Sequence, residues 1–89
     1  MSEPHHLHKT LELAPGALVR VSVTARAFIA LLDDQNYGLY LEDEDFEYYG
    51  DTASRSPFDL RAPFPGLWHL VIEQDDTTQH LSVGVQILG

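Results

Sequence analysis

The chain has 89 residues, which is room for one hydrophobic core, since domains usually run to about 100–150 residues. An apolar share of 44% argues against a disordered polypeptide, and the lack of cysteine excludes disulfides, thiolate nucleophiles and cysteine-ligated zinc. Fourteen Asp and Glu against five Lys and Arg give a formal charge of −9, which disfavours nucleic acid and anionic membranes as partners and favours a basic protein.

The N-terminal segment is polar and contains histidines, and we expect residues 1–6 to be disordered and the single domain to fill the rest of 1–89. No apolar stretch follows a basic start, and no 18 apolar residues run together. These features predict a soluble, cytoplasmic protein.

Two strands are predicted first, at residues 7–13 and 19–24. Val19, Val21 and Val23 alternate with polar residues, which is the period of a strand with one buried face. Residues 14–16, Ala-Pro-Gly, favour a turn, so we expect these two strands to form a hairpin. Residues 25–32 are apolar on both alternating faces and fit either a strand covered on both sides or a short helix; we favour the strand because its neighbours are strands.

The middle of the chain is predicted to continue as strands and loops. Residues 33–36 read as a turn, and Tyr37, Leu39 and Leu41 have strand spacing. An acidic run at 42–45 leads into residues 46–50, a loop at 51–56 and a short strand at 57–62.

The last two predicted strands are residues 67–74 and 81–88, after a turn at 63–66. We expect these strands to pair across residues 75–78, and 81–88 has the clearest alternation in the chain. About six to nine short strands without a long helical period predict an all-β fold, a small antiparallel β-sandwich.

The chain resembles the bacterial family catalogued as domain of unknown function 1883. The resemblance is carried by Pro15 to Val23, Asn36-Tyr37, Tyr40, Tyr48-Tyr49-Gly50, Ser56-Pro57, Pro63, Gly66, Trp68-His69 and Val71. It implies a β-sandwich, sometimes joined to other domains such as TIR-type ones, and it implies no catalytic or cofactor-binding residue. Family members often carry basic residues before the two tyrosines, where this chain is acidic.

Catalytic chemistry finds little support in the sequence. There is no Gly-x-Ser-x-Gly turn and no glycine-rich phosphate loop, so we predict no catalytic residue and no cofactor. Trp68 shares a strand face with Leu70 and Ile72 and is expected in the core. His69, beside Trp68 on the other face, is expected to be a hydrogen-bonded, partly buried imidazole.

Two groups of candidate metal ligands were considered. His5, His6 and His8 lie near a terminus expected to be loose, where nothing would orient their rings. Asp43, Asp45 and Glu47 match the first ligand positions of an EF-hand loop, but Tyr48 and Ser54 occupy the positions that need Gly and Glu. We therefore predict no metal site. A weaker calcium site that uses other loop carboxylates is the alternative, and we favour a solvated acidic edge.

A recognition surface is the best-supported binding site. Tyr48 and Tyr49 should point to opposite faces of a strand, one buried and one exposed, with Arg55 close in sequence. The exposed tyrosine would lie beside the acidic run Glu42, Asp43, Glu44 and Asp45.

Three functions are consistent with these features. The first is a non-catalytic binding or regulatory module that presents this acidic, tyrosine-containing surface to a basic partner protein. The second is a small-molecule sensor or small enzyme with a pocket between the sheets near Trp68, His69 and Arg55. The third is a structural subunit of a homo-oligomer joined through exposed strand edges.

Overall fold

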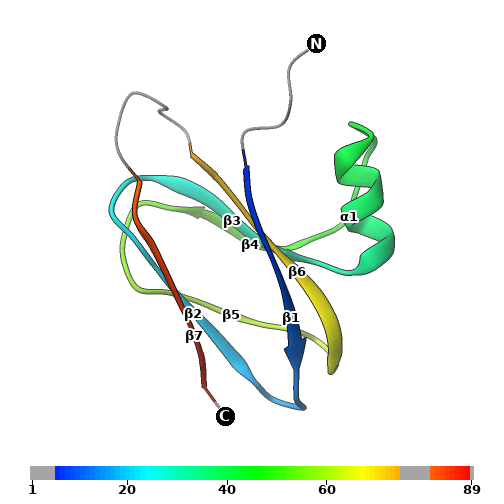
Figure 1. Ribbon diagram of the computed structural model, residues 1–89, viewed down its shortest axis with the longest axis horizontal. Helices are drawn as coiled ribbons and strands as arrows, with labels where there is room; N and C mark the ends of the chain where they lie inside the picture. Colours follow the sequence, from blue (N-terminus) through cyan, green and yellow to red (C-terminus); the bar gives the residue numbers. More distant parts are fainter. Residues whose placement is uncertain (1–5, 75–80, 89) are drawn as a thin grey trace.

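The computed structural model describes residues 6–74 and 81–88, which form seven β-strands and one short α-helix (Figure 1). The elements in chain order are β1 (His6–Leu13), β2 (Leu18–Val23), β3 (Ala27–Leu32), α1 (Asp34–Leu41), β4 (Tyr49–Ala53), β5 (Phe58–Arg61), β6 (Gly66–Gln74) and β7 (Val83–Leu88). Residue 6 therefore starts a strand, whereas we expected no fixed structure there; residues 1–5 lie outside the described part.

The strands form two antiparallel sheets. The first sheet has the order β1-β6-β3-β4 and the second has the order β5-β2-β7. The predicted all-β sandwich is confirmed.

The predicted strand pairings are wrong in two places. β1 and β2 do not form a hairpin, because β1 pairs with β6 and β2 pairs with β5 and β7. Likewise β6 and β7 belong to different sheets; the turn predicted at residues 75–78 lies outside the described residues. An alternating pattern fixes which face of a strand is apolar and does not fix which strand is its neighbour. Both connections pass from one sheet to the other.

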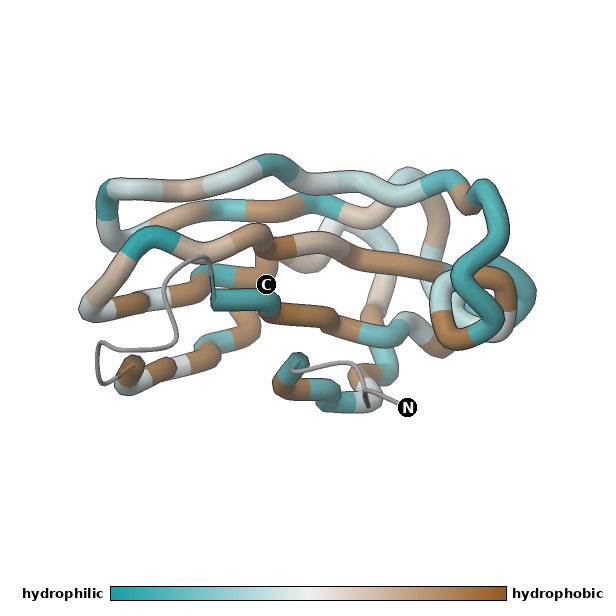
Figure 2. The backbone as a smooth tube through the Cα atoms, turned by 90° about the horizontal axis from the view of Figure 1, so that it is seen from above, coloured by the Kyte–Doolittle hydropathy of each residue, from teal (hydrophilic) through white to brown (hydrophobic). Residues whose placement is uncertain are grey.

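The core lies between the two sheets. In Figure 2 hydrophobic and hydrophilic segments alternate along several strands, as expected for strands with one buried face. Most of the largest buried side chains come from the inner faces of both sheets: Val19, Val21, Ile29, Leu31, Trp68 and Leu70. Trp68 is 1% exposed and donates a hydrogen bond from its indole N–H to the Phe64 carbonyl at 3.0 Å, so its predicted burial is confirmed.

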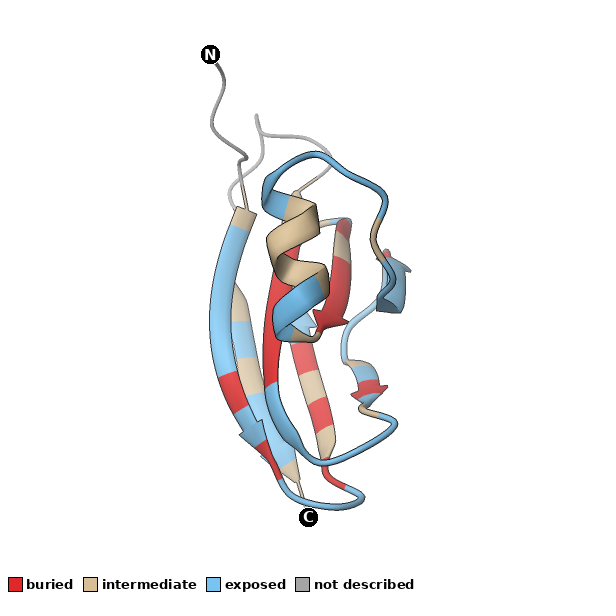
Figure 3. Ribbon diagram, turned by 90° about the vertical axis from the view of Figure 1, so that its right-hand side faces the viewer, coloured by how far each residue is buried: buried red, intermediate tan, exposed pale blue. Residues whose placement is uncertain are grey.

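β3 is covered on both faces, as the sequence predicted for residues 25–32. Its inner face contributes Ile29 and Leu31 to the main core. Its outer face contributes Ala30 and Leu32, which pack with Val71 of β6 under aromatic side chains from α1 and the segment after it. Figure 3 shows α1 in front of these buried strands.

α1 corrects the expectation of a strand at residues 37–41. Asp33 caps the helix, because its Oδ1 accepts hydrogen bonds from the backbone N–H and the side-chain amide of Asn36 at 2.8 and 2.9 Å. Tyr37 and Tyr40, three residues apart, then lie on the helix face directed at the sheet. Within the described part of the chain, no helix has the length and apolar character needed to cross a bilayer.

Candidate functional site

A histidine–tyrosine cluster lies between α1 and the outer face of the first sheet. It consists of His6, His8, His69, Tyr37 and Tyr40. His6 and His8 are two residues apart in β1 and share a face, and His69 lies on the neighbouring strand β6. The helix supplies the two tyrosines, so three separate segments build the cluster.

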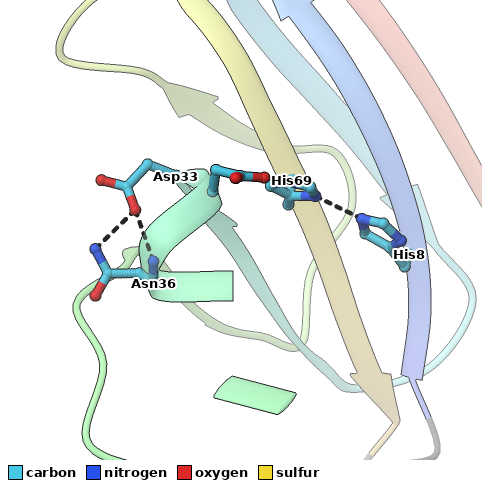
Figure 4. A network of polar contacts seen from close by, with 5 residues as sticks. His8, Asp33, Asn36 and His69 are labelled. Carbon is cyan, nitrogen blue, oxygen red and sulfur yellow. Dashed lines mark hydrogen bonds and ion pairs between the residues drawn. The ribbon is translucent and has the colours of Figure 1, made fainter. Parts of the chain in front are cut away.

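A chain of hydrogen bonds runs through this cluster (Figure 4). The Nε2 atom of His69 lies 2.9 Å from Oδ1 of Asp34, and its Nδ1 atom lies 2.7 Å from Nε2 of His8. One tautomer set satisfies both contacts: His69 donates from Nε2 to the carboxylate and accepts at Nδ1 from the Nε2–H of His8. The Asp34–His69–His8 chain thus ties the first turn of α1 to β6 and β1.

Tyr37 of α1 packs against both members of the hydrogen-bonded pair His8 and His69. Its ring stacks on His8 with centroids 4.2 Å apart and on His69 with centroids 4.4 Å apart. Partial desolvation, together with the nearby imidazoles of His69 and His6, lowers the pKa of His8 below its usual value. Burial also raises the pKa of the Tyr37 phenol.

The far end of the cluster is held by Tyr40 and His6. The Tyr40 hydroxyl donates a hydrogen bond to the Glu73 carboxylate. Burial raises the pKa of Tyr40, and this hydrogen bond raises it further. His6 packs edge-on against Tyr40 at 5.1 Å, and its Nε2 atom lies 3.3 Å from the Tyr37 hydroxyl. These contacts keep both tyrosines protonated and fixed against the sheet.

The cluster ties α1 to the first sheet. His69 is 8% exposed and both of its ring nitrogens are engaged, so the predicted hydrogen-bonded, partly buried imidazole is confirmed. Trp68, the preceding residue in β6, points into the core, so the two side chains face opposite sides of the sheet and cannot line one pocket between the sheets. Among the described residues, no group of three His, Cys, Asp or Glu side chains is arranged to hold a metal ion.

The acidic run follows the last turn of α1, which corrects the expectation that it lies on an edge strand. Asp43 has a positive φ of 59°, and its N–H bonds the Tyr40 carbonyl at 3.2 Å. The N–H of Glu44 reaches back to the Leu39 carbonyl at 3.0 Å. This pattern is a Schellman motif, which satisfies the last carbonyl groups of a helix. All four carboxylates of residues 42–45 are exposed around it.

An acidic groove of about 520 Å³ lies between the start of α1 and the segment after the acidic run. We define the acidic groove by its lining residues: Asp33, Gln35, Asn36, Leu39, Asp45, Phe46 and Glu47. The backbone N–H of Glu47 donates to the Asn36 side chain at 2.8 Å, which fixes this segment against the helix. The lining of the groove therefore combines carboxylates with the apolar side chains of Leu39 and Phe46.

Both predicted tyrosines are accessible, which corrects the expectation that one is buried. Tyr48 is 44% exposed and packs against Phe28 and Phe46; Tyr49 is 45% exposed and meets the edge of Trp68. They do contact opposite faces, as alternation predicts. Neither is buried, because Tyr48 precedes β4 and β4 is a short strand at the edge of the first sheet.

Arg55 lies in the exposed loop between β4 and β5. Within the described residues it makes no ring contact with Tyr48 or Tyr49. The structure thus brings Tyr48 to the acidic groove through Phe46 and leaves Arg55 outside it.

A comparison with protein families decides the family of the chain. The model described as Domain of unknown function (DUF1883) matches residues 5–88. The chain belongs to this family. The resemblance noted in the sequence is therefore confirmed over nearly the whole chain. No curated protein and no solved structure gives a significant match.

Two parts of this region are not predicted from the sequence. His6, His8 and Tyr37 are not expected to meet, because the spacing of residues 37–41 predicts a strand. Asp33 and Asn36 are not predicted as groove residues. The signal that could have found the helix is Asp33, an N-cap residue type, followed by Asp34 in the first turn.

Proposed function

We propose that this chain is a non-catalytic binding module that holds a basic segment of a partner protein in the acidic groove, with Tyr48 as an aromatic neighbour. The observation that carries the proposal is the position of Glu42, Asp43, Glu44 and Asp45. These carboxylates stand at the C-terminus of α1, and the last turn of the helix contains no basic residue.

Negative charge at this position opposes folding. The C-terminus of a helix carries partial negative charge, so each nearby carboxylate costs about 0.3–1 kcal/mol at low salt. Mutual repulsion among neighbouring carboxylates adds to this cost. A local arrangement that weakens the fold without a compensating contact is typical of a functional surface. A cationic partner would supply the missing compensation.

The groove suits lysine or arginine side chains in particular. Asp45 and Glu47 offer carboxylates at its walls, and Asp33 keeps a second oxygen beyond the one that caps the helix. Leu39 and Phe46 offer apolar contact for the methylene part of a long basic side chain. The ring centroids of Tyr48 and Phe46 are 5.7 Å apart, so Tyr48 is close enough to contact a neighbouring residue of the same bound segment.

The proposal is tested by titrating an acetylated decalysine peptide into isotope-labelled protein and mapping backbone amide shifts by NMR. We expect saturable shifts concentrated at residues 33–36 and 45–48, which weaken as salt is added. The variant Glu42→Gln/Asp43→Asn/Glu44→Gln/Asp45→Asn should bind the peptide more weakly, because it removes Asp45 from the groove and three carboxylates beside it.

The control is Glu12→Gln, which removes one exposed charge from β1 on another part of the molecule. It should leave the pattern of shifts unchanged. Shifts distributed over all acidic residues alike, or centred outside the groove in the wild-type protein, would count against the proposed function.

A further inference from the structure

A second cavity lies between the two sheets at one side of the sandwich, where an edge strand of each sheet is exposed. The other two edge strands, β4 and β5, lie at the opposite side. β1 ends the first sheet and β7 ends the second, and they are not paired. Between them is a cavity of about 250 Å³. It is lined by Leu7, Lys9, Leu70, Ile72, Val83 and Val85, and we call it the β1–β7 seam.

The walls of this seam are apolar and only partly covered. Leu70 and Ile72 are the floor, buried at 1% and 2% exposure, while Val83 and Val85 of β7 are only half-buried. Leu7 at the mouth is 52% exposed. The inner faces of the two sheets therefore diverge here without filling the space between them, and the apolar surface is accessible from solvent.

Lys9 gives the seam its chemical selectivity. It alternates with Leu7 and the buried Leu11 on the inner face of β1, so its side chain lines the same cavity. Within residues 6–74 and 81–88 no carboxylate is paired with its ammonium group. His8 also borders the cavity, but its imidazole lies on the outer face of the sheet against His69 and Tyr37. One cation at the mouth of an apolar cavity matches an anionic head group on an apolar body.

We propose that the β1–β7 seam binds a small apolar carboxylate, with its hydrocarbon between the sheets and its carboxylate on Lys9. The size of the cavity limits the ligand. A cavity of about 150 Å³ holds the six carbons of benzene, so about 250 Å³ has room for roughly eight to ten carbons. A medium-chain fatty acid satisfies both the length and the charge.

An inward-pointing lysine on an edge strand can also serve only to prevent edge-to-edge association. The two roles differ in what they predict. If Lys9 only protects the edge, its charge is needed and no hydrocarbon chain needs to bind. The proposed site needs both the charge of Lys9 and the apolar walls. The ligand and the variants below separate these roles.

The test is a titration with sodium octanoate at pH 7.5 and constant ionic strength, followed by calorimetry and by NMR of the backbone amides. We expect saturable binding with shifts at Leu7, Lys9 and Val85. Lys9→Gln should weaken octanoate binding about tenfold, as for a lost charge-assisted hydrogen bond, and Lys9→Arg should restore most of it. Octanol, which has the same chain without the charge, should bind weakly and equally to wild type and Lys9→Gln.

Two further variants complete the experiment. Arg55→Gln removes the same charge from an exposed loop and should leave octanoate affinity within twofold of wild type. Val83→Phe narrows the seam and should abolish the binding of both ligands while the thermal midpoint shows that the protein is folded. The proposal is overturned if octanoate does not saturate, if Lys9→Gln binds it as wild type does, or if sedimentation shows a dimer that buries Leu7 and Val85.

Discussion

His8 is the residue at which stability should respond to mild acid. Its pKa is lowered from 6.5, so the folded state takes up a proton less readily than the unfolded chain. The contribution of neutral His8 is therefore fully present above pH 6.5 and is lost as the pH falls through the lowered pKa. His8→Phe keeps a ring against Tyr37 and removes the titration.

As the pH falls below 6.5, we expect the free energy of unfolding of wild type to fall more steeply than that of His8→Phe, as measured by urea unfolding. The difference in slope isolates His8, because the carboxylates and the other histidines are common to both proteins. Equal slopes would show that protonation of His8 does not weaken the Asp34–His69–His8 hydrogen-bond chain.

Gly50 is the position where a single methyl group should be most damaging. It lies opposite Ala30 in the β3–β4 register, and a Cβ atom there would stand 2.0 Å from the Ile29 carbonyl oxygen. Backbone atoms cannot move aside as a side-chain end can, so we expect Gly50→Ala to cost about 3 kcal/mol. Gly38→Ala is the matched control: it meets no atom within 4 Å, lies inside α1, and should stabilise the protein by about 0.5–1 kcal/mol.

Urea unfolding followed by circular dichroism measures both glycine variants. A loss of stability in both proteins would indicate that the close approach to the Ile29 carbonyl is not the cause. A neutral Gly50→Ala would mean that β4 can move away from β3 at little cost, and that the register there is not tightly fixed.

At the level of the elements, α1 shows where reasoning from sequence failed. Tyr37, Leu39 and Leu41 have a period of two, while Asp34, Tyr37 and Tyr40 have the spacing of a helix face. Both patterns coexist over eight residues, and Gly38 lowers helix propensity. The choice is made by contacts with His8, His69 and Glu73, which are distant in the sequence. Local periodicity could not reveal them.

The end of α1 offers a test of its charges. Replacing Glu42, Asp43, Glu44 and Asp45 by their amides removes negative charge from a helix C-terminus and keeps the Schellman motif, because asparagine accepts the positive φ of residue 43. We expect the fourfold variant to gain about 1–2 kcal/mol of stability at low salt and less at high salt. Asp33→Ala, which removes the N-cap, should instead lose about 1 kcal/mol.

Destabilisation of the fourfold variant would show that these carboxylates support the fold, and the functional interpretation of the acidic run would lose its main argument. Salt separates the two effects, because the gain depends on exposed charge and the loss of an N-cap does not. Thermal or urea midpoints at two salt concentrations are sufficient.

At the level of the whole molecule, the sequence predicted the strands and the burial of Trp68 better than the arrangement of the strands. Consecutive strands are neighbours in about two-thirds of cases, so hairpins were the reasonable expectation. Here β1 and β2, and also β6 and β7, enter different sheets. Leu11 and Val21 are buried in the same core from opposite sheets, an arrangement that their alternating patterns fit as well as a hairpin. The candidate site is predicted less well than the strands, because the acidic groove depends on α1.

The net charge of −9 gives the last prediction, which concerns association with a basic partner. Once such a partner has been captured on the immobilised wild-type chain and identified by mass spectrometry, its binding kinetics can be measured at several salt concentrations. Charges beyond contact act mainly on the association rate, and salt limits their reach to about 8 Å at physiological strength. The fourfold amide variant should therefore associate about tenfold more slowly at low salt, with a weaker dependence on salt.

Tyr48 should affect the dissociation rate of the partner. Its ring borders the acidic groove through Phe46, so Tyr48→Ala should speed dissociation and leave the association rate nearly unchanged. Tyr49→Ala is the matched control, because Tyr49 is equally exposed but contacts Trp68 on the other face. Equal effects of the two substitutions would place the partner elsewhere on the edge of the first sheet. A fourfold variant that associates at the wild-type rate would reduce the acidic run to a surface that keeps the protein in solution.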